Sequence, residues 1–352
     1  MTNMLEHMDL DEMSIDLVVT VLRESVYSQR VKALGVEIIQ LSGKLYSSKN
    51  YMQFERILRT RHYDVAYFNV FQALSLVYLY IAHRRGIPKL IAHSHNTDIR
   101  PGVFKPLKVM IHKVASSILS GYATELWACS NMAAEFLFSE EARREKGCRF
   151  IPNGIDLQKF SYDKCAREKV REQIQIGDAL LVGHIGRLCW QKNQVFLLDV
   201  FRELHKKCKN TRLVLVGIGE LNAKLKEKAE ALGIQDKVIF YGSTNSPESL
   251  LSAMDVFVFP SLFEGLGISA VEAQTSGLVT ICSENVPNEA AVSSLFVRKN
   301  ISDGAESWAD TILRYANIPF DRAGAVISPE FDINEVSAMI RDRFDTEECE
   351  NE

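Results

Sequence analysis

The sequence predicts an α/β protein with two doubly wound domains, each built on a mostly parallel sheet. Short apolar runs of strand length alternate with helical patterns along nearly the whole chain, which is typical of parallel sheets covered by helices. A polar stretch at 157–177 interrupts this alternation once, and a second alternating series then begins. The length of 352 residues is sufficient for two domains of ordinary size.

The elements of the first half follow from these periodicities. We expect strands at 13–20, 36–41, 65–70, 89–96 and 124–130, and helices at 24–35, 50–61, 105–119 and 131–138, with an apolar helix that ends at His83. A Pro-Asn-Gly turn signal within 149–156 closes this half. We therefore place an N-terminal Rossmann-like domain at 1–160.

The second half repeats the pattern. We expect strands at 180–186, 211–219, 236–242, 255–260 and 278–283, and helices at 195–208, between 219 and 236, at 247–254, after 267 and at 332–344. This predicts a second Rossmann-like domain at 161–335, then a C-terminal helix and acidic tail at 336–352 whose last residues, 346–352, we expect to be disordered. In such folds ligands bind at the carboxyl ends of the strands and between the domains.

Composition narrows the function classes. A hydrophobic content of 47%, a charged content of 24% and a net charge of -4 argue against a nucleic-acid-binding protein. The charge is unevenly divided, because residues 1–160 hold 20 basic against 16 acidic side chains and the remainder is acidic. A basic N-terminal half suits an anionic membrane surface or a phosphorylated acceptor. A solvated face without a partner is the equally weighted alternative.

Cysteine usage and hydropathy suggest the compartment. The seven cysteines are scattered, without the spacing of a zinc site, and reduced thiols are the simplest account. The N-terminus is acidic and polar, unlike a signal peptide, and the most apolar run, 67–82, is too short to span a bilayer. We expect a cytoplasmic protein, with peripheral contact at the inner face of the plasma membrane as an option.

The most informative segment runs from Pro260 to Gly277. Two glutamates, Glu264 and Glu272, flank a glycine-bearing turn between a predicted strand and a predicted helix. Backbone N–H groups at a helix N-terminus favour a phosphate, and glycines let it approach closely. The carboxylates suit sugar or ribose hydroxyls, which donate hydrogen bonds. A phosphate beside hydroxyl-bearing rings describes a nucleotide sugar.

A second signal lies at 184–194, where a strand ends and Arg187 and Lys192 follow. Together these cations could neutralise a diphosphate leaving group, whereas the alternative is a pair of surface cations at a helix start. The Gly217-Ile218-Gly219 turn lacks the third glycine of a dinucleotide fingerprint, since Asn222 stands there. We interpret it as a tight strand exit near the nucleotide, and this disfavours a nicotinamide-dependent oxidoreductase.

Two further features leave alternatives open. His93 and His95 end a predicted strand, where a histidine could bond a sugar hydroxyl, although a structural role is somewhat more common there. The helix at 105–119 carries lysines beside apolar residues, which suits peripheral membrane contact or a core face. We favour the core face, with the lysines directed to solvent.

Taken in order, the segments AHSHN, PNGID, GRLCWQKN and the glutamate pair resemble the family 4 retaining glycosyltransferases of the GT-B fold, especially bacterial members that build capsular polysaccharide or exopolysaccharide. The resemblance covers nearly the whole chain. It implies that Glu272 binds the donor ribose and that Glu264 lies beside the donor sugar as a catalytic residue. It also implies a backbone cradle for the distal phosphate made by Gly265, Leu266, Gly267 and Ile268.

The same resemblance implies that Arg187 and Lys192 contact the diphosphate and that His95, rather than His93, is the catalytic histidine on the sugar side. It implies no metal and no cofactor, since the nucleotide sugar, in our expectation a UDP-sugar, is a substrate. The acceptor would be a saccharide or a lipid-linked saccharide, and no side-chain nucleophile is required.

One departure from the family pattern concerns the N-terminus. The family begins with a strand and a glycine-rich loop, whereas this sequence opens on MTNMLEHMDLDEMSIDLVV, which we interpret as the end of the first helix and the second strand. We therefore expect the first strand and its loop to be absent from this sequence. A catalytically impaired nucleotide-sugar-binding accessory protein is the corresponding alternative function.

Overall fold

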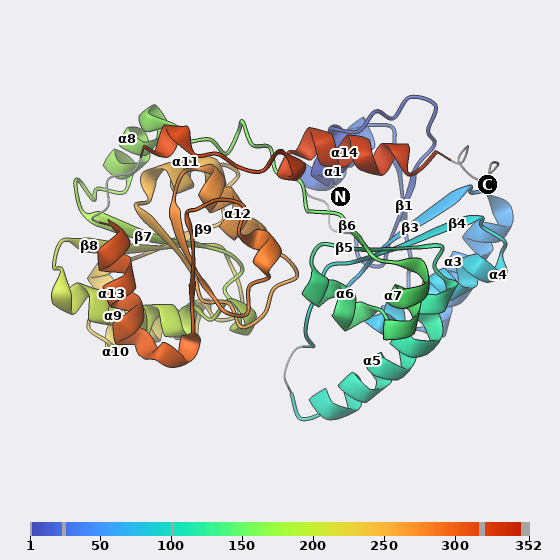
Figure 1. The fold of residues 1–352 in the computed structure, drawn as a ribbon, viewed down its shortest axis with the longest axis horizontal. Helices are drawn as coiled ribbons and strands as arrows, with labels where there is room; N and C mark the ends of the chain where they lie inside the picture. Colours follow the sequence, from blue (N-terminus) through green and yellow to red (C-terminus); the bar gives the residue numbers. More distant parts are fainter. Residues whose placement is uncertain (1, 23–25, 100–101, 317–320, 346–352) are drawn as a thin grey trace. The chain divides into compact units, whose positions relative to one another are not determined.

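The computed structural model describes residues 2–22, 26–99, 102–316 and 321–345 (Figure 1). Within them the chain divides into two compact units, 2–154 together with 330–345, and 155–329. Each unit is an α/β structure with parallel strands only among its described residues. The tail expected to be disordered, 346–352, lies outside the described residues.

The first unit contains two parallel sheets. One pairs β1 (Asp16–Val19) with β2 (Glu37–Gln40), and the other has four strands in the order β3-β4-β5-β6. Those four strands are β3 (Val65–Val70), β4 (Lys89–Ser94), β5 (Glu125–Ala128) and β6 (Arg149–Phe150). The helices are α1 (Thr2–Glu6), α2 (Val26–Ala33), α3 (Ser48–Thr60), α4 (Leu76–Arg84), α5 (Lys105–Leu119), α6 (Asn131–Leu137), α7 (Glu140–Lys146) and α14 (Ile333–Asp342).

Both faces of the four-stranded sheet are covered. Leu90 and Ile91 are neighbours on β4, so their side chains point to opposite faces, and both are fully buried. Leu90 packs in an apolar cluster with Phe54 of α3, while Ile91 packs in another with Trp127 of β5. A parallel strand buried on both faces explains the consecutive apolar residues Leu90, Ile91 and Ala92.

The C-terminal helix α14 completes the first unit. Val336 of α14 lies in the same apolar cluster as Met4 of α1, and the Ser337 hydroxyl donates to the Met4 carbonyl at 3.1 Å. Gly154 permits this return of the chain, because a Cβ there would lie 2.8 Å from the Cα of Ile333. The two ends of the described chain are therefore packed together although they are distant in sequence.

The second unit holds one six-stranded parallel sheet in the order β12-β11-β10-β7-β8-β9 (Figure 1). The strands are β7 (Leu180–Ile185), β8 (Thr211–Val216), β9 (Val238–Gly242), β10 (Val256–Phe259), β11 (Val279–Ser283) and β12 (Phe296–Lys299). The helices are α8 (Lys164–Gln173), α9 (Gln194–Lys207), α10 (Asn222–Ala231), α11 (Pro247–Ala253), α12 (Ile268–Thr275) and α13 (Gly304–Ala316).

The sheet reverses its direction of growth between β7 and β10. From β7 the chain adds β8 and β9 on one side, and β10, β11 and β12 then fill the other side. In doubly wound sheets such a reversal leaves a crevice outside the carboxyl ends of the two central strands, and ligands bind there. The fold therefore directs attention to the loops that follow β7 and β10.

Most expected elements are present, with ends shifted by a few residues. The helix at Lys105–Leu119 and the strand at Val65–Val70 have the expected bounds. Sequence reasoning missed α7, β6, β12 and α13. One interpretation was wrong: the apolar side chains of α5 do not form a core face, since Leu107, Met110, Val114 and Ile118 are at least half exposed. Helical periodicity identifies an apolar stripe but not what covers it.

Candidate functional site

A buried ion pair joins the two loops at the reversal of the second sheet. Lys192 follows β7 and Glu264 follows β10, and the lysine Nζ lies 2.6 Å from the glutamate Oε1. Their side chains are only 16% and 7% exposed. The Lys192 ammonium also lies 4.6 Å from the centre of the Phe259 ring, a favourable cation–π distance. The carboxylate is therefore held in place by a cation that is itself fixed by packing.

Gln191 reinforces this arrangement. Its side-chain amide donates to the Phe263 carbonyl at 3.0 Å and to the Glu264 Oε2 at 3.4 Å. The Leu262 N–H in turn donates to the Gln191 carbonyl at 2.8 Å. These bonds tie the loop after β10 to the loop after β7, so the position of the carboxylate depends on both. Gln191 lies in the segment GRLCWQKN, but the sequence analysis assigned no role to this residue.

The N-terminus of α12 opens next to this pair. Gly267 has a left-handed backbone with φ of 96°, a conformation that residues with a Cβ rarely adopt. A Cβ there would also lie 3.3 Å from both the Phe259 and the Val286 side chains. The first N–H groups of a helix lack intrahelical acceptors, so they present a site for an anion. Leu266 is buried and Ile268 begins the helix half exposed, which leaves backbone as the polar surface of this turn.

Glu272 is the fifth residue of α12, about one and a half helical turns beyond Gly267. Burial raises the pKa of its carboxyl to about 7, while the charges of Lys159 and Lys192 oppose that rise. Among the described residues its carboxylate has no hydrogen-bond or ion-pair partner. A partly buried acid without a partner is a group prepared to accept hydrogen bonds from a ligand.

Arg187 is the most exposed of the expected donor contacts. It follows β7, its side chain is 68% exposed, and its Nη2 donates to the Glu220 carboxylate at 3.0 Å. The Gly217 turn after β8 lies directly against the same loop, because a Cβ on Gly217 would be 2.1 Å from the Gly186 carbonyl oxygen. Gly217 therefore serves a close approach of two strand exits.

Behind the loops, His184 and Gln194 form a buried polar contact that sequence reasoning missed. His184 on β7 bonds the Val258 carbonyl through Nδ1 at 2.9 Å, and its Nε2 lies 3.1 Å from the Gln194 side-chain nitrogen. Burial lowers the pKa of His184 to about 4, so the ring is neutral. The Gln194 nitrogen also donates to the Arg187 carbonyl at 2.8 Å, which anchors the backbone of the loop after β7.

His95 belongs to the first unit and lies just beyond the end of β4. Its Nε2 lies 2.7 Å from the Asn69 Oδ1 of β3, which fixes the proton on Nε2 because an amide oxygen only accepts. Burial lowers the pKa of His95 to about 4, so the ring is a neutral donor and acceptor near pH 7. Asn69 had no expected role, and only the pairing of β3 with β4 reveals it.

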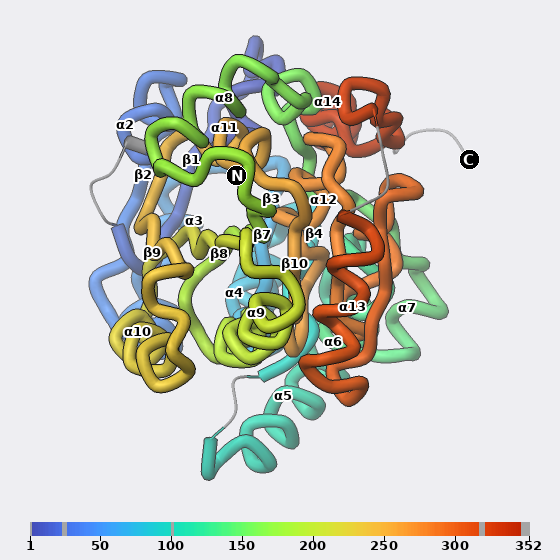
Figure 2. Tube along the Cα trace, turned by 90° about the vertical axis from the view of Figure 1, so that its left-hand side faces the viewer, coloured from blue at the N-terminus to red at the C-terminus, as the bar shows by residue number. Residues whose placement is uncertain are grey.

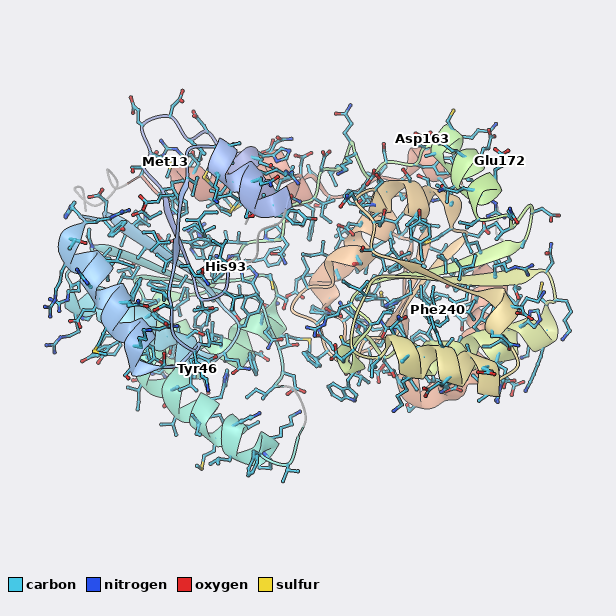
Figure 3. The ribbon with its side chains drawn as sticks, turned by 180° about the vertical axis from the view of Figure 1, so that it is seen from behind. Met13, Tyr46, His93, Asp163, Glu172 and Phe240 are labelled. Carbon is cyan, nitrogen blue, oxygen red and sulfur yellow. The ribbon has the colours of Figure 1, made fainter. Side chains whose placement is uncertain are left out.

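His93 occupies a different environment from His95. His93, which is labelled in Figure 3, is 2% exposed. Its Nδ1 lies 2.6 Å from the Tyr67 hydroxyl. Its ring packs 6.0 Å from Trp127 and 4.0 Å from the His95 ring, measured between centres. Burial holds the pKa of His93 well below its usual value. His93 therefore supports His95 from within the core.

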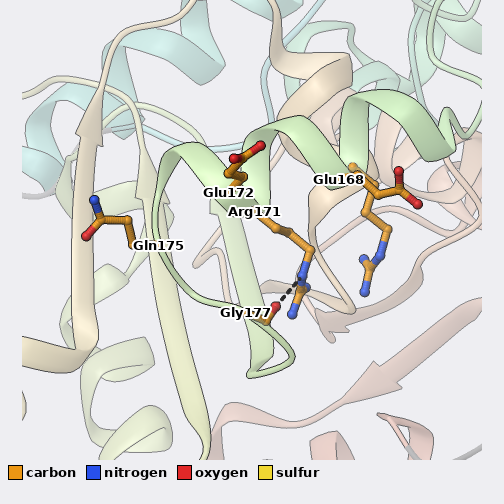
Figure 4. A pocket seen from close by; sticks show the side chains of 6 residues that line it. Glu168, Arg171, Glu172, Gln175 and Gly177 are labelled. Atoms are coloured by element: carbon orange, nitrogen blue, oxygen red, sulfur yellow. Dashed lines mark hydrogen bonds between the residues drawn. The ribbon is translucent and has the colours of Figure 1, made fainter.

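A separate pocket in the second unit has a structural explanation. It is lined by Arg167, Glu168, Arg171, Glu172, Gln175 and Gly177, along and after α8 (Figures 3 and 4). Its arginines are already satisfied, since Arg171 donates to the Gly177 carbonyl at 3.0 Å and both arginines bond Asp255. They hold α8 against the start of the sheet and leave little donor capacity for a ligand.

The described residues contain no cluster of three or more histidine, cysteine, aspartate or glutamate side chains placed to hold a metal ion. The helices within them are too short or too polar to cross a bilayer.

Comparison with known proteins decides the family. Residues 166–322 match the model of the glycosyl transferases group 1. EpsF of Bacillus subtilis (strain 168), which bears the name of a glycosyltransferase, is 32% identical over 295 residues, covering 81% of this chain and 77% of that protein. The chain is a group 1 glycosyltransferase. The matched region contains every residue discussed at the reversal of the second sheet.

A further relative of this glycosyltransferase is named for surface polysaccharide synthesis. The capsular polysaccharide biosynthesis glycosyltransferase CapH of Staphylococcus aureus is 24% identical, with 89% of this chain and 85% of CapH covered. Among solved structures, Anabaena Alr3699/HepE in complex with UDP and glucose superposes with a TM-score of 0.77 at 19% identity, covering 98% and 94% of the two chains. This likeness confirms the expected GT-B fold, with two Rossmann-like domains.

Proposed function

We propose that this glycosyltransferase moves a sugar from a UDP-sugar, with retention, to a saccharide or lipid-linked saccharide in the synthesis of a surface polysaccharide. The observation that carries the proposal is the Lys192–Glu264 pair beside the N-terminus of α12, at the reversal of the sheet. Cations and the backbone N–H groups at a helix N-terminus suit a diphosphate, and a carboxylate held in position suits sugar hydroxyls.

The donor choice is supported by two relatives. HepE is solved with UDP-glucose, and an Escherichia coli relative, 25% identical over 254 residues, covering 70% of this chain and 65% of that protein, is named UDP-Gal:alpha-D-GlcNAc-diphosphoundecaprenol alpha-1,3-galactosyltransferase. The name of the second relative also supplies a lipid-linked acceptor. We extend both features, a UDP-sugar donor and a lipid-linked acceptor, to this chain as part of the proposal.

In the proposed complex the leaving UDP carries the largest change in charge. Lys192 and Arg187 would balance it, and Arg187 is free to turn because its present partner Glu220 is at the surface. The turn Gly265, Leu266, Gly267 and Ile268 would bond the distal phosphate through backbone N–H groups. The second unit is thus the nucleotide-sugar domain of the proposal, and the first is the acceptor-side domain.

The carboxylates would divide the recognition of the rings. Glu272 would accept hydrogen bonds from the ribose hydroxyls, and Glu264, oriented by Lys192, would face the donor sugar. His95, held neutral with its proton on Nε2, would contribute from the first unit as a hydrogen-bonding group rather than as a cation. With the leaving phosphate assisting attack on the same face, retention needs no side-chain nucleophile.

The proposal is tested by measuring UDP binding and sugar transfer on the same preparation. UDP-glucose and UDP-galactose are offered with undecaprenyl-diphosphate-linked GlcNAc, and the anomeric configuration of the product is determined by NMR. We expect transfer with retention, weaker UDP binding in Glu272→Ala, and lower turnover with near-normal binding in Glu264→Ala. Glu227→Gln, on the exposed side of α10, is the control. Tight UDP binding without transfer to any saccharide, or parent rates in both variants, would contradict the proposal.

A further inference from the structure

Trp190 exposes its ring next to the candidate site of the second unit. It begins the short 3₁₀ helix Trp190–Lys192 after β7, whose last residue forms the ion pair with Glu264. Trp190 is 39% exposed, more than any other aromatic residue among the described residues of this unit. Tryptophan has a large apolar surface that is normally covered by protein. An indole left open beside a functional carboxylate therefore indicates a contact with a ligand.

A second aromatic ring supports the indole from the neighbouring loop. The rings of Trp190 and Phe263 lie with their centres 5.9 Å apart and their planes tilted by 43°. Phe263 precedes Glu264 in the loop after β10, and β7 and β10 are neighbours in the sheet (Figure 2). The ends of two adjacent strands thus place two aromatic rings beside one carboxylate, and part of the indole surface stays open to solvent.

Hydrogen bonds of the two loops hold this aromatic pair in place. The Gln191 side-chain amide donates to the Phe263 carbonyl at 3.0 Å, and the Leu262 N–H donates to the Gln191 carbonyl at 2.8 Å. The Asn193 N–H donates to the Trp190 carbonyl at 3.2 Å, and Asn193 has a left-handed backbone with φ of 54°. Because the backbone next to both rings is fixed, a ligand that contacts the rings would cost little ordering of the protein.

The chemistry of this surface suits a sugar ring. A pyranose has one face that carries mainly C–H groups, which can lie on the apolar face of an indole, while its hydroxyls point outward at the edge. The Trp190 indole N–H has no acceptor among the residues that the structure describes, so it can donate to a sugar hydroxyl. Gln191, the next residue, adds an amide at the edge of the ring. An apolar surface with a few polar groups beside it is typical of a site that orients a small ligand.

Burial distinguishes the two sugars of the proposed reaction. The Glu264 side chain is only 7% exposed, and the turn proposed for the distal phosphate begins at the next residue. The groups proposed to hold the donor sugar are therefore buried, whereas the Trp190 ring is open to solvent. The acceptor sugar has to reach the donor sugar from solvent and must lie against it when the new bond forms. The exposed ring is accordingly suited to the acceptor.

We propose that Trp190, supported by Phe263, is a stacking platform for the acceptor saccharide. A pyranose ring of the acceptor would lie on the indole, and one of its hydroxyls would accept a hydrogen bond from the Trp190 Nε1–H. This inference rests on the proposed function and adds to it the part of the acceptor that the second unit recognises. That part is the sugar, because a lipid diphosphate without a sugar has no ring to place on the indole.

Tryptophan fluorescence tests the proposal without requiring sugar transfer. The sequence has three tryptophans, and the other two, Trp127 and Trp308, are fully buried, so quenching by acrylamide reports on Trp190. With UDP present, undecaprenyl diphosphate that carries GlcNAc or galactose should reduce the quenching of the full chain. Undecaprenyl diphosphate without a sugar, in the same detergent, and UDP alone should leave the quenching unchanged. Protection by either of these two controls, or protection by neither saccharide, would overturn the proposal.

Substitutions at Trp190 provide a second measurement. Trp190→Ala should raise the KM for the saccharide acceptor roughly tenfold or more, with the affinity for UDP unchanged by calorimetry. Trp190→Phe keeps a flat ring and should retain most of the acceptor affinity. Tyr315→Ala, at an aromatic residue in the last turn of α13 of the same unit, is the control and should behave like the parent.

The outcomes separate this inference from the proposed function. If Trp190→Ala weakens UDP binding as much as it raises the acceptor KM, the ring only holds the loop after β7 and the proposal fails. Transfer to a saccharide that does not protect Trp190 would overturn the stacking platform but leave the proposed function intact. Protection by a saccharide without any transfer would contradict the proposed function and support the platform.

Discussion

We expect the ionised carboxylate of Glu272 to lower the stability of the folded protein while it favours binding of the donor. The perturbation is Glu272→Gln, which keeps the shape and hydrogen-bonding ability of the side chain but removes its charge. Burial raises the pKa of this carboxyl from 4.5 to about 7, and at about 1.4 kcal/mol for each pH unit the ionised form costs the folded state roughly 3 kcal/mol.

The pH window follows from the direction of this shift. An acid whose pKa is higher in the folded than in the unfolded state destabilises the fold as pH rises above the unfolded value, and the cost is complete once pH exceeds the folded value. Glu272→Gln should therefore increase the free energy of unfolding by roughly 3 kcal/mol at about pH 8, and by little at about pH 4.5. Urea unfolding at both pH values measures the difference.

Donor binding should show the opposite effect of the same charge. Hydroxyls that donate to the carboxylate favour its ionised form, so UDP affinity should rise with pH up to about 7 and then level off. Calorimetry in buffers of different ionisation enthalpy should detect proton release from the parent near pH 7 and less from Glu272→Gln. Glu227→Gln is the surface control for both measurements. An unchanged stability at about pH 8, or proton release equal to that of the parent, would refute the reasoning.

Three other predictions concern the remaining site residues. In a double-mutant cycle, Lys192→Ala and Glu264→Ala should each lower the free energy of unfolding by about 3 kcal/mol, and together by much less than the sum, because each single change removes the ion-pair partner of a buried charge. Additive losses would show that the pair is not coupled. Asn69→Ala should lower kcat about tenfold with unchanged stability, because the His95 ring loses the hydrogen bond that orients it. In the parent, kcat should show no ionisation of His95 between about pH 5.5 and 8, because the pKa of His95 is about 4. A kcat that falls as pH drops through about 6.5 in the parent, and does not do so in His95→Gln, would contradict this low pKa. Gly267→Ala should destabilise the chain by about 1–2 kcal/mol and weaken UDP binding, since φ of 96° is unfavourable for alanine; thermal unfolding and calorimetry report both, and an unchanged affinity would argue against a phosphate at this turn.

The sequence by itself determined the α/β class, the order of most strands and helices, and the segments proposed to form the site. Those properties depend on local periodicity and on residue types such as the glycine at 267, whose left-handed backbone few other residues tolerate. Two of the missed elements, β12 and α13, lie in the last third of the chain, and two others, β6 and α7, lie near its middle. Local sequence signals were therefore sufficient to predict the fold class and most of the secondary structure.

Only the tertiary structure decided how these parts are used. It paired Lys192 with Glu264 and Asn69 with His95, because neighbouring strands bring together residues far apart in sequence. It set the raised pKa of Glu272, since desolvation depends on everything packed around a group. It also turned the apolar stripe of α5 outward, which no helical periodicity can indicate. The burial of a residue depends on the residues packed around it, and these come together only when the chain folds.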